Sequence, residues 1–209
     1  MSVFQLPLKL CNDLNAIYAR FWWGQVNNER KIHWKSWSVL SQSKKEGGMG
    51  FRDIRSFNLA ILAKQGWRLL QDQETLIYKC FKARYFPWVS FLEATDVPNS
   101  SYVWKSLIAA KPILKRGCCW RVGDGANIWA FHDKWMPNYP TNKALYPPLD
   151  GDWDCRVSDL IDWNTHDWNR SIIAAKFHPK DMEAMVQIPL SRRHVLDVLM
   201  WLHNKKGLF

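Results

Sequence analysis

The stretch that decides the fold reads Phe21-Trp22-Trp23-Gly24, then His33-Trp34-Lys35-Ser36-Trp37, then Gly47-Gly48-Met49-Gly50-Phe51-Arg52-Asp53. Four tryptophans fall within sixteen residues. Rings at this density indicate either a core built on aromatic side chains, which is their commoner use, or a surface that stacks on a flat ligand. Because lysines and arginines are interleaved with the rings, nucleic acid is the flat, anionic ligand that the pattern favours.

The composition bounds the class of protein. The chain has 209 residues, of which 47% are hydrophobic and 14% aromatic, enough for one folded core or two small domains. No run of about 18 apolar residues is present, so we expect no contact with a membrane interior. The five cysteines are scattered and the six histidines lack metal-ligand spacing. We therefore expect free thiols, no metal and no cofactor.

The net charge of +10 is unevenly distributed. Residues 1–116 hold 18 Lys and Arg against 8 Asp and Glu, whereas residues 117–209 hold 11 of each. This asymmetry predicts an acidic partner for the first part of the chain. A solvated basic face without a partner is the alternative interpretation. The residues that we expect to contact phosphates are Lys31, Lys35, Lys44, Lys45, Arg52, Arg55, Lys79, Lys82 and Arg84.

Helical patterns dominate residues 1–116. Helices are predicted over residues 57–71, with Ser56 as the cap, over residues 74–85, and from Ser100 or Ser101, where Pro112 is expected to end or kink the helix. Gly66, inside the helix predicted over residues 57–71, is expected to mark close packing against another helix. Residues 34–40 suit a short helix or an extended segment, and residues 44–50 a loop. Another helix is predicted before these, because Leu6, Leu10, Leu14, Ile17 and Phe21 form an apolar stripe at helical spacing.

The pattern changes after residue 117. Residues 118–122 and 126–131 flank Gly123-Asp124-Gly125 and predict a hairpin. Short helices are expected from Ser158, over residues 168–177 and over residues 179–187. Residues 195–209 resemble a strand and the start of its partner. The predicted fold class is α+β and mainly helical: a basic helical part (1–116), a connector with a hairpin and short helices (117–194), and a truncated element (195–209).

A series of short motifs follows in one order along nearly the whole chain. Besides the stretch quoted first, it comprises Leu6-Pro7, Phe57-Asn58, Ala63-Lys64-Gln65-Gly66-Trp67-Arg68-Leu69, Lys82-Ala83-Arg84-Tyr85-Phe86-Pro87, Trp104-Lys105-Ser106, Trp120-Arg121-Val122-Gly123-Asp124-Gly125, Asp133-Lys134-Trp135, Asp197, Trp201 and Lys206-Gly207-Leu208-Phe209. Together these motifs resemble the reverse-transcriptase polyprotein of plant non-LTR (LINE-type) retrotransposons. The resembling segment lies between the polymerase active site and the reverse-transcriptase zinc-binding domain.

The resemblance implies a role and a partner. Residues 1–116 would correspond to a thumb-like part that grips the template–primer, so the implied partner is RNA or an RNA–DNA duplex. Residues 195–209 would be the truncated start of the zinc-binding domain. The implied location is the nucleus, with the mitochondrion as the alternative.

The chain differs from the family in lacking the catalytic motif of the polymerase. It has no Tyr/Phe-x-Asp-Asp tetrapeptide, whose carboxylates hold the two catalytic metals. The close acidic pair, Asp152 and Asp154, reads as a solvated loop. The zinc ligands and the ribonuclease H domain of such polyproteins would lie beyond Phe209. We therefore expect a non-catalytic fragment with no small-molecule substrate. The alternative is a degenerate transposon-derived reading frame without biochemical activity.

Overall fold

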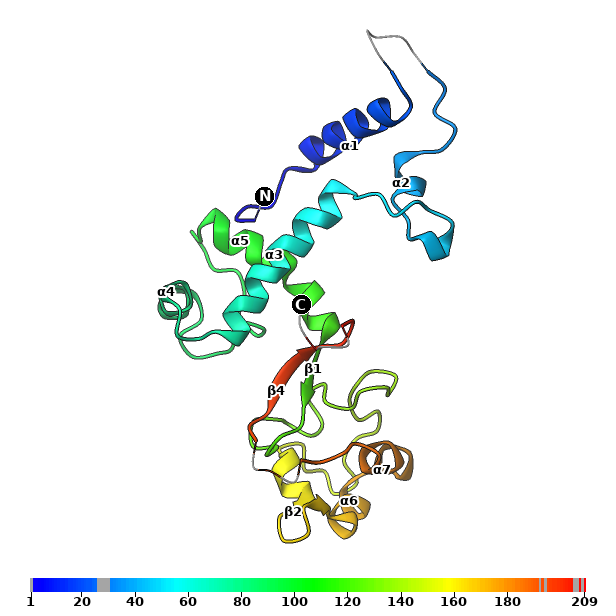
Figure 1. Ribbon diagram of the computed structural model, residues 1–209. Coiled ribbons are helices and arrows are strands. Elements are labelled where there is room, and N and C mark those ends of the chain that lie inside the picture. Colours follow the sequence, from blue (N-terminus) through cyan, green and yellow to red (C-terminus); the bar gives the residue numbers. More distant parts are fainter. Residues whose placement is uncertain (1, 26–30, 192, 194, 205–206, 208) are drawn as a thin grey trace. The chain divides into compact units, whose positions relative to one another are not determined.

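The computed structural model describes residues 2–25, 31–191, 193, 195–204, 207 and 209. The chain divides into two compact units, unit 1 (Met1–Arg116) and unit 2 (Gly117–Phe209) (Figure 1). The fold is α+β and mainly helical, which confirms the predicted class. In the part of the chain that the structure describes, no helix has the length and apolar character needed to span a membrane.

Unit 1 is built from helices. They are α1 (Leu8–Trp22), α2 (Trp37–Leu40), the 3-10 turn η1 (Lys44–Glu46), α3 (Ile54–Gln71), α4 (Leu76–Tyr85) and α5 (Tyr102–Gly117). The side chains of Ser36, Asp53 and Thr75 cap α2, α3 and α4. The predicted cap of α3 was wrong: Asp53, not Ser56, is the cap. Its carboxylate accepts a hydrogen bond from the Ser56 N–H (2.8 Å), and the helix begins at Ile54.

A stack of aromatic rings forms the core of unit 1. Trp104 is fully buried and lies nearly parallel to Tyr85 (ring centroids 4.6 Å apart, 9°) and to Phe86 (5.5 Å, 13°). A Cβ atom at Gly66 would lie 2.9 Å from the Leu114 side chain, so α3 and α5 approach closely there, as expected. Pro112 lies inside α5 and does not end it, since the helix continues to Gly117; Lys111 and Leu114, on either side of the proline, are buried.

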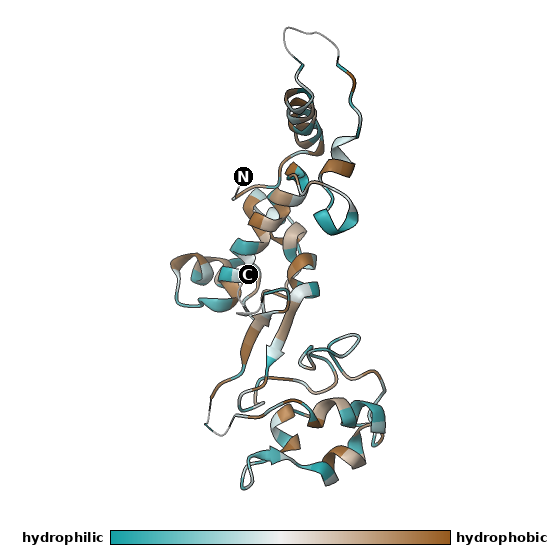
Figure 2. Ribbon diagram, turned by 45° about the vertical axis from the view of Figure 1, so that its right-hand side comes forward, coloured by the Kyte–Doolittle hydropathy of each residue, from teal (hydrophilic) through white to brown (hydrophobic). Residues whose placement is uncertain are grey.

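Helix α1 is present as predicted, but its apolar stripe is not buried. The exposed fractions of Leu10, Ile17 and Phe21 are 44%, 48% and 83%, and the side chains that α1 buries are Cys11 and Ala19. Both colours of the hydropathy scale appear along this helix (Figure 2). The stripe therefore predicted the helix correctly and its buried face wrongly.

Asn58 of α3 holds the segment that leads into α1. Its carboxamide is 1% exposed; its oxygen accepts a hydrogen bond from the Leu6 N–H (2.9 Å) and its nitrogen donates one to the Phe4 carbonyl (3.0 Å). The Gln5 N–H donates to the Ser106 hydroxyl (2.8 Å). Polar contacts, rather than the apolar stripe, thus fix where α1 begins.

In unit 2, β1 (Cys118–Arg121) pairs antiparallel with β4 (Val198–Trp201), with Cys118 opposite Trp201 (Figure 1). The predicted hairpin between residues 118–122 and 126–131 was wrong. Residues 126–131 turn instead into the core, where Ile128 is fully buried. The strand predicted within residues 195–209 is present as β4, and its partner is β1. Lys206 and Leu208 of the last motif lie outside the described residues.

Short elements enclose the core of unit 2. They are η2 (Val157–Leu160), β2 (Ile161–Asp162), β3 (Asp167–Trp168), α6 (Arg170–Lys176) and α7 (Pro179–Val186). Both predicted helices are present with narrower bounds, and η2 begins before Ser158. Asp181, fully buried, accepts hydrogen bonds from the Tyr139 hydroxyl (2.8 Å) and from the N–H groups of Leu145 (3.2 Å) and Tyr146 (3.1 Å). This carboxylate thereby anchors the segment of residues 139–146 to α7.

The Asp197 carboxylate explains why the Gly-Asp-Gly loop does not form a hairpin turn. It accepts hydrogen bonds from the N–H groups of Gly123 (2.8 Å), Gly125 (2.9 Å) and Asn127 (3.0 Å). Gly125 has a φ of +68°, and a Cβ atom there would lie 2.5 Å from the Ser158 nitrogen. The loop thus binds a side chain from just before β4 and so closes unit 2.

We predict that Asp197→Ala destabilises unit 2 by about 2–4 kcal/mol, because three N–H groups lose a charged acceptor. Hydrogen exchange of the β1 and β4 amides would measure this loss. Asp124→Ala is the matched control: it removes an aspartate from the same loop, where the side chain accepts one bond, from Ala126 (3.3 Å). Equal protection in the two variants would contradict the role of Asp197.

Candidate nucleic-acid interface

The predicted basic residues lie in two groups within unit 1. Lys44 and Lys45 lie on η1, and Arg52 and Arg55 flank the start of α3, whereas the other group is on α4. Helix α3 lies between the two groups in the sequence; it has 18 residues and is therefore about 27 Å long. Figure 1 shows α2 and its loop towards one end of α3 and α4 towards the other.

The α4 group makes contacts within the chain. Lys79 forms an exposed ion pair with Glu74 (2.9 Å). The Lys82 amine donates to the Val89 carbonyl (2.8 Å). The Arg84 guanidinium lies 5.6 Å from the centre of the ring of its neighbour Tyr85. The side chains of these three residues therefore already make contacts within the chain, which a phosphate contact would have to replace or share.

The group before α3 is more available. Lys31, Lys35, Lys44 and Lys45 are exposed. Across the described residues, the side chains of Lys35, Lys44 and Lys45 make no hydrogen bond or ion pair. In Figure 2 the polar turn of η1 directly follows the apolar turn of α2. This group has the exposure that contact with phosphates requires.

Backbone hydrogen bonds close the loop that carries Lys44 and Lys45. The N–H groups of Met49 (3.0 Å) and Phe51 (3.2 Å) donate to the Leu40 carbonyl. A Cβ atom at Gly48 would clash with the backbone of Gln42, so glycine is required at that close approach. The glycine-rich segment is thus a tight turn, as predicted, that returns Phe51 to α2.

Phe51 belongs to an aromatic hollow of about 410 Å³ on unit 1. Its ring meets Trp22 edge to face (centroids 4.6 Å apart, 76°) and Trp37 at a tilt (5.2 Å, 30°). The Arg52 guanidinium lies 4.8 Å from the centre of the Phe57 ring. We call this feature the aromatic hollow; its lining is Tyr18, Phe21, Trp22, Trp37, Phe51, Arg52, Ile54 and Phe57.

The rings of the hollow correct the expectation that the tryptophans pack in a core. Trp67 is buried, at 6% exposure, but Trp22 and Trp34 are 45% and 74% exposed. Phe21, in the same stretch, is the most exposed aromatic residue of the lining, at 83%. The helical spacing of Phe21 signalled that α1 would bury it. The feature of the sequence that indicates the hollow is instead the number of aromatic residues close to Arg52.

Asn15 and Asp53 link α1 to α3 beside the hollow. The Asn15 amide nitrogen donates to Asp53 (2.8 Å), and its oxygen accepts from the Ile54 N–H (3.2 Å). Burial raises the pKa of Asp53, but hydrogen bonds from Ser56 and Asn15 outweigh it and lower the pKa below its ordinary value. The capping carboxylate is therefore stabilised in its ionised form.

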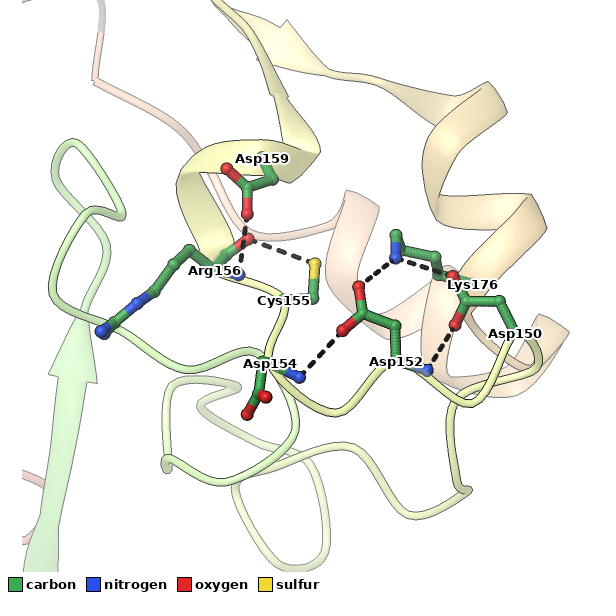
Figure 3. Close-up of polar contacts among 7 residues, drawn as sticks. All are labelled: Asp150, Asp152, Asp154, Cys155, Arg156, Asp159 and Lys176. Atoms are coloured by element: carbon green, nitrogen blue, oxygen red, sulfur yellow. Dashed lines mark hydrogen bonds and ion pairs between the residues drawn. The ribbon is translucent and has the colours of Figure 1, made fainter.

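Figure 3 shows the aspartates of residues 150–159: Asp150 and Asp152 contact Lys176, and Asp159 accepts a hydrogen bond from the Arg156 N–H (2.9 Å). The Lys176 amine lies 2.7 Å from both Asp150 and Asp152 and lowers the pKa of both carboxyl groups through its hydrogen bonds. The Asp154 N–H donates to Asp152 (3.1 Å). Within the described ranges, no three His, Cys, Asp or Glu side chains are placed to hold a metal ion.

The adjacent thiols of unit 2 are buried among apolar residues. Burial raises the pKa of Cys118 to about 12 and that of Cys119 to about 11. Thiols with such pKa values are poor nucleophiles at neutral pH. Both are free thiols, as expected.

We predict that Asp53→Asn reduces stability by about 0.5–1 kcal/mol near neutral pH and by almost nothing near about pH 3. Asparagine can still cap α3, but it lacks the charge. Because the folded pKa of Asp53 is lowered, the charge stabilises the fold above the unfolded pKa of about 4, and this is lost as pH falls through the folded value.

Urea unfolding of both proteins across this pH range would measure the difference. Asp13→Asn removes the same charge from an exposed position of α1 and controls for net charge. A difference that stays constant with pH would contradict the prediction.

The chain was compared with known proteins. It is 38% identical over 150 residues to an uncharacterised mitochondrial protein of Arabidopsis thaliana, covering 71% of this chain and 95% of that protein. It is 32% identical over 143 residues to a protein of the same plant provisionally named a ribonuclease H protein; the match covers 67% of this chain and 23% of that protein. No protein-family model and no solved structure matches the chain. The chain belongs to the family of the uncharacterised mitochondrial protein, since it covers nearly all of that relative.

Proposed function

We propose that the chain derives from the reverse transcriptase of a plant LINE-type retrotransposon and that unit 1 grips template–primer nucleic acid without catalysis of its own. The observation that carries the proposal is the placement of charge. The net excess of +10 lies within residues 1–116, which coincide with unit 1, and Lys35, Lys44 and Lys45 are exposed there.

The relatives support a transposon origin. The ordered motifs resemble LINE-type polyproteins, in which a ribonuclease H domain often follows the reverse transcriptase. One relative carries a ribonuclease H name, and the matched segment makes up 23% of that protein. If that name refers to a different domain of the same polyprotein, outside the matched segment, the match is explained. We therefore do not extend ribonuclease H activity to this chain.

The absence of catalysis is part of the proposal. Nucleotidyl transfer by two metals requires neighbouring carboxylates that are open to cations. The tetrapeptide that supplies them in this family is missing from the sequence. Asp150 and Asp152 are each paired with the Lys176 amine, which competes with a cation for the same oxygens.

Phosphate contact predicts a dependence on salt. Each neutralised phosphate releases counterions and adds about 0.9 to the slope of log K against log salt for a duplex. We predict that K44Q/K45Q makes this slope shallower by up to about 2, because both lysines project from one closed loop. Fluorescence anisotropy of a labelled RNA–DNA hybrid, titrated across a salt series, would measure the slope.

The control variant is K143Q/K180Q, which removes the same charge from two exposed lysines of unit 2. It should leave the slope nearly unchanged. Equal effects of the two variants would show that net charge alone matters and would contradict a grip by unit 1. No binding at low salt, in a sample folded by circular dichroism, would favour a degenerate reading frame without activity.

A further inference from the structure

We infer that the aromatic hollow of unit 1 is a stacking site for an unpaired nucleobase. The module would then hold a junction between duplex and single strand, not a plain duplex. This inference deepens the proposed function and rests on it.

The first step is the exposure of the rings. Phe21 is 83% exposed and Trp22 and Tyr18 are 45% and 44% exposed. An exposed apolar patch of this kind normally marks a binding site, because leaving it in water opposes folding. Its 410 Å³ falls within the range of about 300–1,000 Å³ that is typical of sites for small ligands.

The second step is that the rings are held in place. Phe51 contacts Trp22 at 76° and Trp37 at 30°, and Tyr18 contacts Trp37 at 36°. The backbone hydrogen bonds from Met49 and Phe51 to the Leu40 carbonyl fix the loop behind the Phe51 ring. A flat ligand would therefore meet a preformed surface and would order few side chains on binding.

The third step is charge, which favours a nucleotide over an apolar protein partner. Arg52 lines the hollow, Lys35 lies two residues before Trp37, and the loop with Lys44 and Lys45 returns to Phe51. A nucleotide joins a flat apolar base to an anionic phosphate, which matches rings with a basic rim. Bases inside a duplex are already stacked and paired, so an unpaired base is the fitting occupant.

The test uses three labelled ligands: a blunt RNA–DNA hybrid, the same hybrid with a single-stranded extension, and the same hybrid with an abasic extension. The abasic ligand keeps the phosphates and removes the bases. We expect the full chain to bind the extension with bases at least about fivefold more tightly than the abasic one. Phe21→Ala should abolish this preference without changing the binding of the blunt hybrid.

Two further variants sharpen the result. Phe21→Trp keeps a ring and should restore the preference. Trp88→Ala removes a tryptophan that is 93% exposed in the same unit but lies outside the lining, and should retain it. Both changes are at exposed positions, where loss of folding is small.

Each outcome decides the inference. Equal affinity for the extensions with and without bases overturns it, and salt-dependent binding of the blunt hybrid would then leave the proposed function intact. An unchanged preference in Phe21→Ala also overturns it, as does self-association that this substitution removes, since the hollow would then be a contact between copies. No binding to any of the three ligands overturns both proposals.

Discussion

The hydrogen bonds of Asn58 are the constraint on which the shape of unit 1 depends. The side chain is almost fully buried and satisfies one N–H and one carbonyl of residues 4–6. If this buried amide lost its partners, the free energy of unfolding would fall by about 1–3 kcal/mol. Arrangements of residues 4–6 that leave it unpaired are therefore disfavoured. Asn15 adds a second polar link, to Asp53 and Ile54. These contacts orient α1 although the helix buries only two side chains.

Because polar contacts hold α1 in place, its apolar face is not needed for packing within unit 1. Leu10, Ile17 and Phe21 face solvent because the Asn58 and Asn15 contacts, not the stripe, position α1. Phe21 and Trp22 then join rings from α2 and the start of α3 to form the aromatic hollow. The polar links and the exposed rings are therefore two consequences of one arrangement.

Sequence patterns predicted elements better than they predicted partners. Helical spacing located α1, α4 and α7 because period is a local property of the chain. The partner of β1 was missed because Gly123-Asp124-Gly125 has hairpin composition, whereas its N–H groups bind Asp197 far along the chain. Ser56 and Asp53 are both good caps, and the contacts of Asn15 with Asp53 and with the Ile54 N–H favour Asp53. The basic residues were identified from the sequence, but the contacts of Lys79 with Glu74 and of Lys82 with the Val89 carbonyl depend on how the chain turns before and after α4.

The two units use their charged residues differently, and this difference carries the functional argument. In unit 2, Asp197 binds three backbone N–H groups, Asp181 binds Tyr139 and two more, and Lys176 pairs with two aspartates. Folding accounts for these charges. Among the described residues of unit 1, the side chains of Lys35, Lys44 and Lys45 make no hydrogen bond or ion pair, and mutual repulsion between like charges opposes folding. A polyanionic ligand that offers flat, apolar bases would compensate both the excess charge and the exposed rings.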